Sequence, residues 1–131
     1  MMPASCYFKG GQKRCLTLQF EEADNIFDCL EKAMAEARIG EGKIVGCAGT
    51  VKEGLMNGFS QGKYVVREIR DAPLSAASGR FVRTKDGLKG DLHILCKQGM
   101  NSFNGTLVKG MAANGLELKV EFVDLAGSQM F

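Results

Sequence analysis

The sequence is poor in the residues that mark metal-binding, nucleic-acid-binding and membrane-spanning proteins. It contains no tryptophan, two prolines and one histidine, and its net charge is only +2. A zinc site usually needs three protein ligands or more, so a site built from histidines alone is excluded. A charge this small provides no strong field to hold a polyanion. No apolar run reaches the ~18 residues of a membrane-spanning helix, and no contact with a membrane is predicted.

The cysteines indicate a reducing compartment. Their number is odd, they form no CxxC pair, and they lie inside apolar segments, at positions 6, 15, 29, 47 and 96. This pattern is typical of reduced thiols used as small core residues in an intracellular protein. The first residues, MMPASCYFKGG, lack the apolar stretch of a signal peptide. We therefore expect a cytoplasmic protein, with the nucleus as the alternative.

Length and composition indicate a single globular domain over residues 1–131. The chain is 45% hydrophobic and 24% charged, and no repeat, linker or low-complexity tract divides it. Its seventeen glycines fall mostly between short runs rich in Val, Ile, Leu, Phe and Tyr, at turns such as Gln61-Gly62 and Asn114-Gly115. We predict strands near 6–9, 15–20, 43–50, 54–59, 63–69, 74–83, 90–97, 102–109 and 116–125.

One segment has the period of a helix. In DNIFDCLEKAMAEARIG, apolar residues recur every three or four positions, which predicts a helix over about 24–38. Asp24 or a neighbour would cap its start and Gly40 would end it. One helix with about eight strands predicts an α+β fold with a curved, mostly antiparallel sheet.

A single helix can cover only part of one face of such a sheet. Apolar residues nevertheless occupy both alternating sides of the predicted strands, at Ile44, Val45, Val65, Val66, Ile69, Leu107, Val108, Val120, Phe122 and Val123. Removing this area from water is favourable by about 25 cal/mol per Å². The uncovered face therefore predicts an oligomer.

Few residues suggest catalysis. The stretch GCAGTVKEG at 46–54 has no GK[ST] signature and no helical pattern after it, so it is not a phosphate-binding loop. Asp91 and His93 lie two apart in a predicted strand and should point to the same side, where a carboxylate could orient an imidazole. The alternative is a surface pair without chemistry. The basic residues are scattered, and their convergence on a phosphate-tracking groove stays open.

The order of the segments resembles the PPC (plant and prokaryote conserved) domain, which follows AT-hooks in plant nuclear proteins. The resemblance covers about residues 13–125 and rests on KIVGCAGTVKEGLMNGF, GKYVVREIRDAPLSAASGRF, DLHILCKQGMNSFNGTLVKG and LELKVEFVDL. It implies a homotrimer with a central helix and a curved antiparallel sheet. The RGRP core of an AT-hook is missing from this sequence, so any DNA binding is expected to be weak.

The resemblance also implies a three-histidine metal site in prokaryotic relatives. The matching positions here are Asp91, His93 and Thr106, so two of the three imidazoles are missing. We therefore expect no cofactor and no zinc, although Asp91, His93, Asn104 and Thr106 could still line a binding pocket.

These observations leave two classes of function. The first is a non-enzymatic trimeric module that binds a protein partner or DNA, with the metal site degraded. The alternative is a metal-dependent or small-molecule-binding enzyme that uses Asp91 and His93, by analogy with the similar fold of acetolactate decarboxylases.

Overall fold

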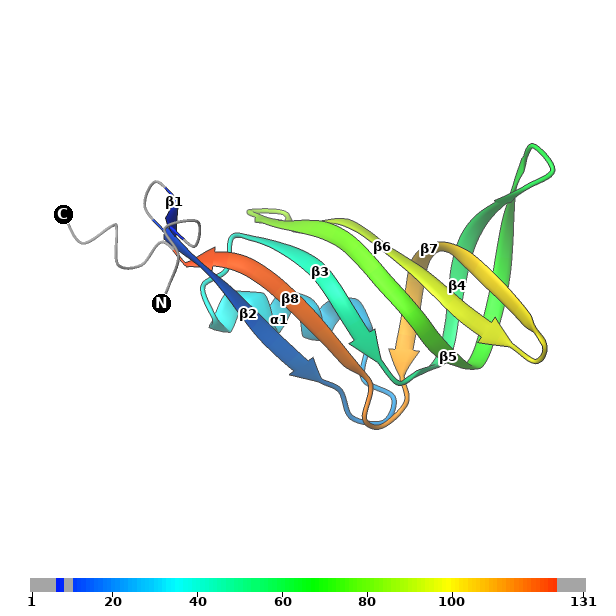
Figure 1. The fold of residues 1–131 in the computed structure, drawn as a ribbon. Helices are drawn as coiled ribbons and strands as arrows, with labels where there is room; N and C mark the ends of the chain where they lie inside the picture. The colour runs from blue at the N-terminus through cyan, green and yellow to red at the C-terminus, as the bar shows by residue number, and fades with distance from the viewer. Residues whose placement is uncertain (1–6, 9–10, 125–131) are drawn as a thin grey trace.

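The computed structural model describes residues 7–8 and 11–124, which form one long antiparallel sheet with one helix on its face (Figure 1). The elements in chain order are β1 (Tyr7–Phe8), β2 (Gly11–Gln19), α1 (Ile26–Glu36), β3 (Glu41–Ala48), β4 (Thr50–Ser60), β5 (Lys63–Thr84), β6 (Gly87–Gln98), β7 (Asn101–Ala112) and β8 (Glu117–Asp124). The predicted α+β class is confirmed. Of the predicted strand at 6–9, residues 6 and 9 lie outside the described residues.

The sheet is open at one end and closed at the other. Its strand order is β1-β2-β8-β3-β5-β4-β7-β6, every pair is antiparallel, and β5 also pairs with β6. Strands β5, β4, β7 and β6 therefore form a ring in which each pairs with the next. Closing the ring removes the exposed strand edges. The backbone N–H and C=O groups of these four strands therefore need no further strand as a partner.

The predicted strands at 63–69 and 74–83 are one continuous strand, which corrects the prediction. β5 has 22 residues and pairs with β4 up to Pro73, then with β6 from Leu74 onward. Asp71, at φ 46°, bends the chain before Pro73. The proline lies where the pairing changes partner, so its missing N–H does not end the strand.

Helix α1 is two residues shorter at each end than predicted. Asn25 caps it, because its side-chain oxygen accepts a hydrogen bond from the Asp28 amide at 3.1 Å. The helix ends at Glu36, and Arg38, not Gly40, takes the left-handed conformation at φ 58°. The amide of Ile39 then donates to the Met34 carbonyl at 2.8 Å, which closes the last turn.

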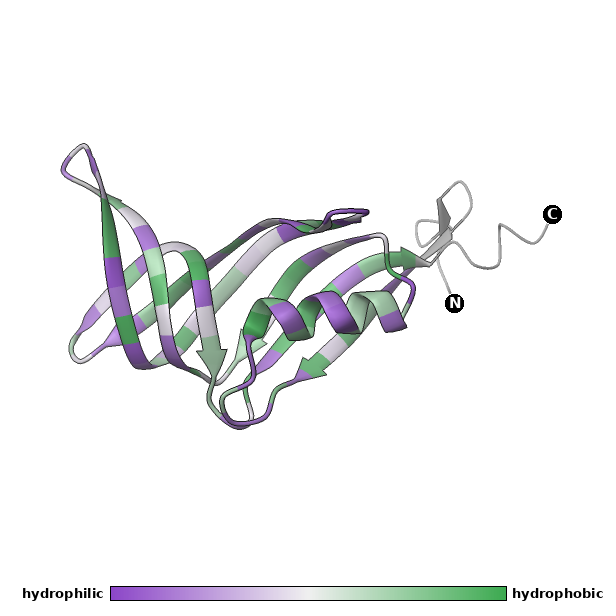
Figure 2. Ribbon diagram, turned by 180° about the vertical axis from the view of Figure 1, so that it is seen from behind, coloured by the Kyte–Doolittle hydropathy of each residue, from purple (hydrophilic) through white to green (hydrophobic). Residues whose placement is uncertain are grey.

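The core lies between α1 and the sheet. Ile26, Leu30 and Met34 recur every four residues and are buried against the strands. Phe27 contacts Phe81 of β5 with ring centroids 6.2 Å apart. Figure 2 shows α1 lying across one face of the sheet, and Figure 1, which views the opposite face, shows α1 behind the strands.

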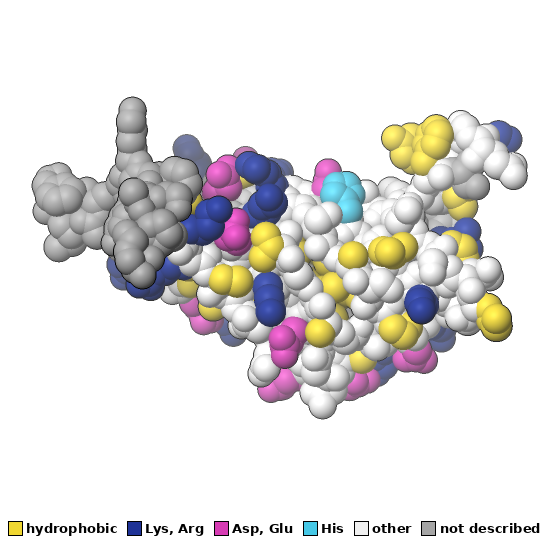
Figure 3. Space-filling model, viewed as in Figure 1, with side chains coloured by type: hydrophobic (Ala, Val, Ile, Leu, Met, Phe, Trp, Pro, Cys, Tyr) yellow, Lys and Arg dark blue, Asp and Glu magenta, His cyan; other side chains and the backbone are white. Residues whose placement is uncertain are grey.

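We call the uncovered side the helix-free face, and alternation along the strands assigns residues to it. Phe81 points toward α1, so Val82 points away from it. The face carries Lys43, Arg80, Val82, Asp91, His93 and Val123. Figure 3 looks onto it and shows apolar side chains scattered among charged ones.

Among the described residues, no helix has the length and hydropathy needed to cross a membrane.

Candidate functional site around His93

Strand β6 sorts its side chains by alternation, as the sequence predicts. Leu92, Ile94 and Cys96 are buried, whereas Asp91 and His93 are exposed on the helix-free face. The imidazole therefore faces solvent and not the core. Figure 3 shows the histidine at the molecular surface.

His93 has one hydrogen-bond partner among the side chains. In the sheet register it lies opposite Thr106 of β7 and Ser78 of β5. The Thr106 hydroxyl lies 3.1 Å from Nδ1 of His93, and which of the two donates depends on the imidazole tautomer. A single hydroxyl partner orients the ring.

A shallow hollow of about 320 Å³ adjoins the histidine on the helix-free face. Three strands contribute its lining, which comprises Ala76, Ala77, Ser78, His93, Ile94, Leu95, Asn104 and Gly105. Of the four residues predicted to form a pocket, His93 and Asn104 line this hollow. Thr106 contacts it only through its hydrogen bond to His93, and Asp91 lies opposite Arg80, outside the lining.

Two glycines explain the close approach of β5 and β6 beside Asp91. Gly79 and Gly90 both have a φ of 148°, a conformation that side chains disfavour. A β carbon at Gly79 would overlap the carbonyl oxygen of Asp91, and one at Gly90 would overlap that of Arg80. Glycine is required at both positions, and the close pairing of β5 with β6 that it permits positions the part of β6 that carries Asp91 and His93.

The donors around His93 do not fit a zinc ion. Zinc favours four ligands drawn from thiolate, imidazole and carboxylate, and here one imidazole lies beside a neutral hydroxyl. Over residues 7–8 and 11–124, no three side chains of His, Cys, Asp or Glu come together in a group that could hold a metal ion. No catalytic step through a metal follows from this arrangement.

Three of the described thiols are also poorly placed for nucleophilic chemistry. Burial raises the pKa of Cys29, Cys47 and Cys96, which keeps these thiols protonated at neutral pH. Cys96 is fully buried, with its sulfur 3.9 Å from that of Met56. Cys15 is exposed and Cys6 lies outside the described residues.

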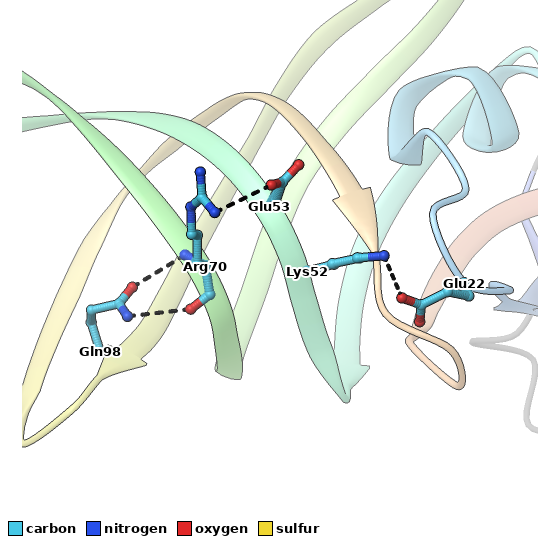
Figure 4. A network of polar contacts seen from close by, with 5 residues as sticks. All are labelled: Glu22, Lys52, Glu53, Arg70 and Gln98. Carbon is cyan, nitrogen blue, oxygen red and sulfur yellow. Dashed lines mark hydrogen bonds and ion pairs between the residues drawn. The ribbon is translucent and has the colours of Figure 1, made fainter.

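A second hollow, of about 400 Å³, lies where β4 is flanked by β5 and β7, and the sequence did not predict it. Charged residues of both signs line it, and Arg70 and Glu53 form an ion pair at 3.7 Å across it (Figure 4). The Gln98 amide binds both the N–H and the carbonyl of Arg70. These contacts tie β5 to the end of β6, which favours a structural role.

Figure 4 also shows the exposed ion pair of Lys52 with Glu22, whose charged atoms lie 2.7 Å apart. The hydrogen bond from Lys52, then that from the Asn114 amide, lowers the pKa of Glu22. A lowered carboxyl pKa contributes stability at neutral pH that is lost as the pH falls through the folded-state value. Both groups are exposed, so this contribution is small.

Comparison with known proteins identifies the family. Residues 7–122 match the model of the Plants and Prokaryotes Conserved (PCC) domain. The chain belongs to this family. The resemblance noted in the sequence is therefore confirmed. The family match covers nearly all of the described residues of this PCC domain. Among curated proteins no match was found.

Solved structures share the PCC fold at low identity. A metal-containing protein from Archaeoglobus fulgidus is 18% identical, with a TM-score of 0.68 over 90% of this chain and 84% of its own. A PPC protein from Pyrococcus horikoshii is 16% identical, with a TM-score of 0.67 over 87% and 80%. A protein from Ralstonia eutropha, named as a candidate DNA-binding protein, is 16% identical, with a TM-score of 0.66 over 88% and 83%.

Replacing His93 with alanine should leave the fold intact. The side chain is exposed and makes one hydrogen bond, so we expect His93→Ala to lower the free energy of unfolding by about 1 kcal/mol or less. Ile94→Ala, one residue away but buried, should cost about 2 to 5 kcal/mol. Urea unfolding of both variants measures the difference. A larger loss for His93 than for Ile94 would contradict the surface role assigned to the imidazole.

Proposed function

We propose that this PCC domain is a non-enzymatic homotrimeric module that binds a macromolecular partner. The observation that carries the proposal is the helix-free face. Val82 is 40% exposed and Val123 is 41% exposed on this face, and both lie near the ends of paired strands. Burial of a valine side chain away from water lowers the free energy. Helix α1 buries only the opposite side of the sheet. Other copies of the chain would provide the missing layer.

The site around His93 supports a binding module over an enzyme. Among the residues that the structure describes, the side-chain partner of the exposed His93 imidazole is the Thr106 hydroxyl, whereas general acid–base or nucleophilic catalysis would need a carboxylate or thiol in contact. Elemental analysis of the purified protein separates the two classes. We expect less than one zinc per chain, and one tightly held ion per chain would favour the metal-dependent alternative.

A protein is the partner that the surface favours, and DNA is the second candidate. The name of the Ralstonia eutropha neighbour supports DNA binding, whereas the net charge of +2 argues against a strong phosphate-binding surface. A mobility-shift titration at low salt tests this candidate. Binding that weakens steeply as salt rises would favour DNA, and no shift would favour a protein.

A charge placed on the helix-free face should dissociate the trimer. Val82 lies opposite Lys89 on β6, so a glutamate there can be tolerated by an isolated chain. In the assembly, however, the glutamate at position 82 would be buried against another copy. Its carboxylate would then lose its hydration, which destabilises the assembly. We expect Val82→Glu to raise the concentration at which the assembly half-dissociates by tenfold or more, as measured by sedimentation velocity.

The matched control is Ala35→Glu, which adds the same charge on the exposed side of α1. It should leave the assembly unchanged. If Val82→Glu assembles as tightly as Ala35→Glu, the helix-free face is not the interface.

A further inference from the structure

The hairpin between β4 and β5 extends beyond the sheet as a two-stranded arm, which we define as residues 58–66. β4 pairs with β7 only as far as Asn57, and β5 pairs with β6 only from Leu74. Beyond these points the two strands pair only with each other, around a turn in which Gln61 and Gly62 both have positive φ. Figure 1 shows this hairpin, in green, projecting from the closed end of the sheet.

The arm is apolar and uncovered. Tyr64 is 81% exposed, Phe59 67% and Val66 65%, and Val65 is also exposed. The rings of Phe59 and Tyr64 pack edge to face, with centroids 5.1 Å apart. A two-stranded ribbon is only marginally stable in water on its own, so an arm of this composition calls for a surface that covers it.

The composition of the arm favours a protein over a nucleic acid. Lys63 is the only charged residue between positions 58 and 66. Binding to a phosphate backbone relies on several cations, whereas exposed aromatic side chains are typical anchors at protein interfaces.

The hollow beside β6 offers a surface that complements such an anchor. Its lining combines apolar Ala76, Ala77 and Leu95 with polar Ser78 and Asn104, whose side chains can hydrogen-bond to a phenol hydroxyl. The arm and this hollow lie on the same strand, β5, about a dozen residues apart. The arm cannot fold back into its own hollow without breaking the pairing of β5 with β4.

From this juxtaposition we infer that the arm of one copy docks by Phe59 and Tyr64 into the hollow on the helix-free face of a second copy. The inference rests on the proposed self-association and names its contact. Arm and hollow are different patches, so the contact is head-to-tail, and a contact of this kind builds a trimer when its rotation closes the ring after three copies.

Two variants test the contact from its two sides. Phe59→Ser with Tyr64→Ser removes the anchor, and Ala76→Glu places a charge at an exposed position in the hollow. Each should raise the half-dissociation concentration by tenfold or more in sedimentation velocity. Met100→Ser is the control, because Met100 is fully exposed at the tip of another hairpin and should be dispensable.

Mixing the two variants tests the pairing itself. The Ala76→Glu chain keeps an intact arm and the serine variant keeps an intact hollow, so an equal mixture should form a dimer of twice the 14.2 kDa chain mass and no trimer. A mixture that stays monomeric would overturn the docking of arm into hollow. A wild-type trimer that survives both variants would also overturn it, while leaving the proposed function in place. A monomeric wild type would refute both.

Discussion

A single methyl group added at Gly79 should destabilise the protein by more than about 4 kcal/mol, among the largest effects of one substitution. The residue has a φ of 148°, which a side chain disfavours. Its new β carbon would also overlap the carbonyl oxygen of Asp91 in the paired strand. That oxygen belongs to the backbone, so relief requires β5 and β6 to separate. Urea unfolding of Gly79→Ala, at fixed protein concentration, measures the loss.

Gly40→Ala is the matched control. Gly40 lies after α1, and a β carbon there would meet no atom within 4 Å. We expect a change within about 1 kcal/mol, and even a gain, because alanine restricts the unfolded chain more than glycine does. Equal stability of the two alanine variants would show that β5 and β6 do not pair as closely at Gly79 as described.

Leu30→Ala should be the second most damaging change, at about 2 to 5 kcal/mol. Leu30 lies at the centre of α1 and is fully buried against the sheet. Truncation loses its burial and leaves a cavity that the rigid strands around it cannot close.

Lys32→Ala provides the comparison, because Lys32 is exposed on the same helix and alanine has the higher helix propensity. Its effect should stay within about 0.5 kcal/mol. A loss below 0.5 kcal/mol for Leu30→Ala as well would mean that α1 does not bury this side chain.

The fold could be predicted wherever one local pattern decided it. The helical period of Ile26, Leu30 and Met34 identified α1, and glycine-containing turns marked most strand ends. The error lay at 63–84, where Asp71 and Pro73 have the local signature of a loop. Pro73 lies where β5 changes partner, and that depends on pairing with β4 and β6, which are distant in sequence.

The site was only partly predictable for the same reason. Alternation placed Asp91 and His93 on one side of β6, and the structure agrees. The hydrogen bond between His93 and Thr106 depends on the register of β6 with β7, which alternation alone does not determine. Gln61-Gly62 was recognised as a turn, but the projection of the arm follows from where β7 stops pairing with β4.

The two sides of the sheet are covered unevenly. Hydrophobic burial by α1 stabilises one side, whereas the helix-free face and the arm keep Val82, Phe59 and Tyr64 in water. We propose that association of copies of the chain covers these side chains.

The solution mass of the wild-type chain tests this claim most directly. Light scattering coupled to gel filtration should give three times the 14.2 kDa chain mass, and a series of dilutions should show dissociation only at low concentration. A mass of one chain at every concentration would contradict the account, because the helix-free face and the arm would then be stable in water uncovered.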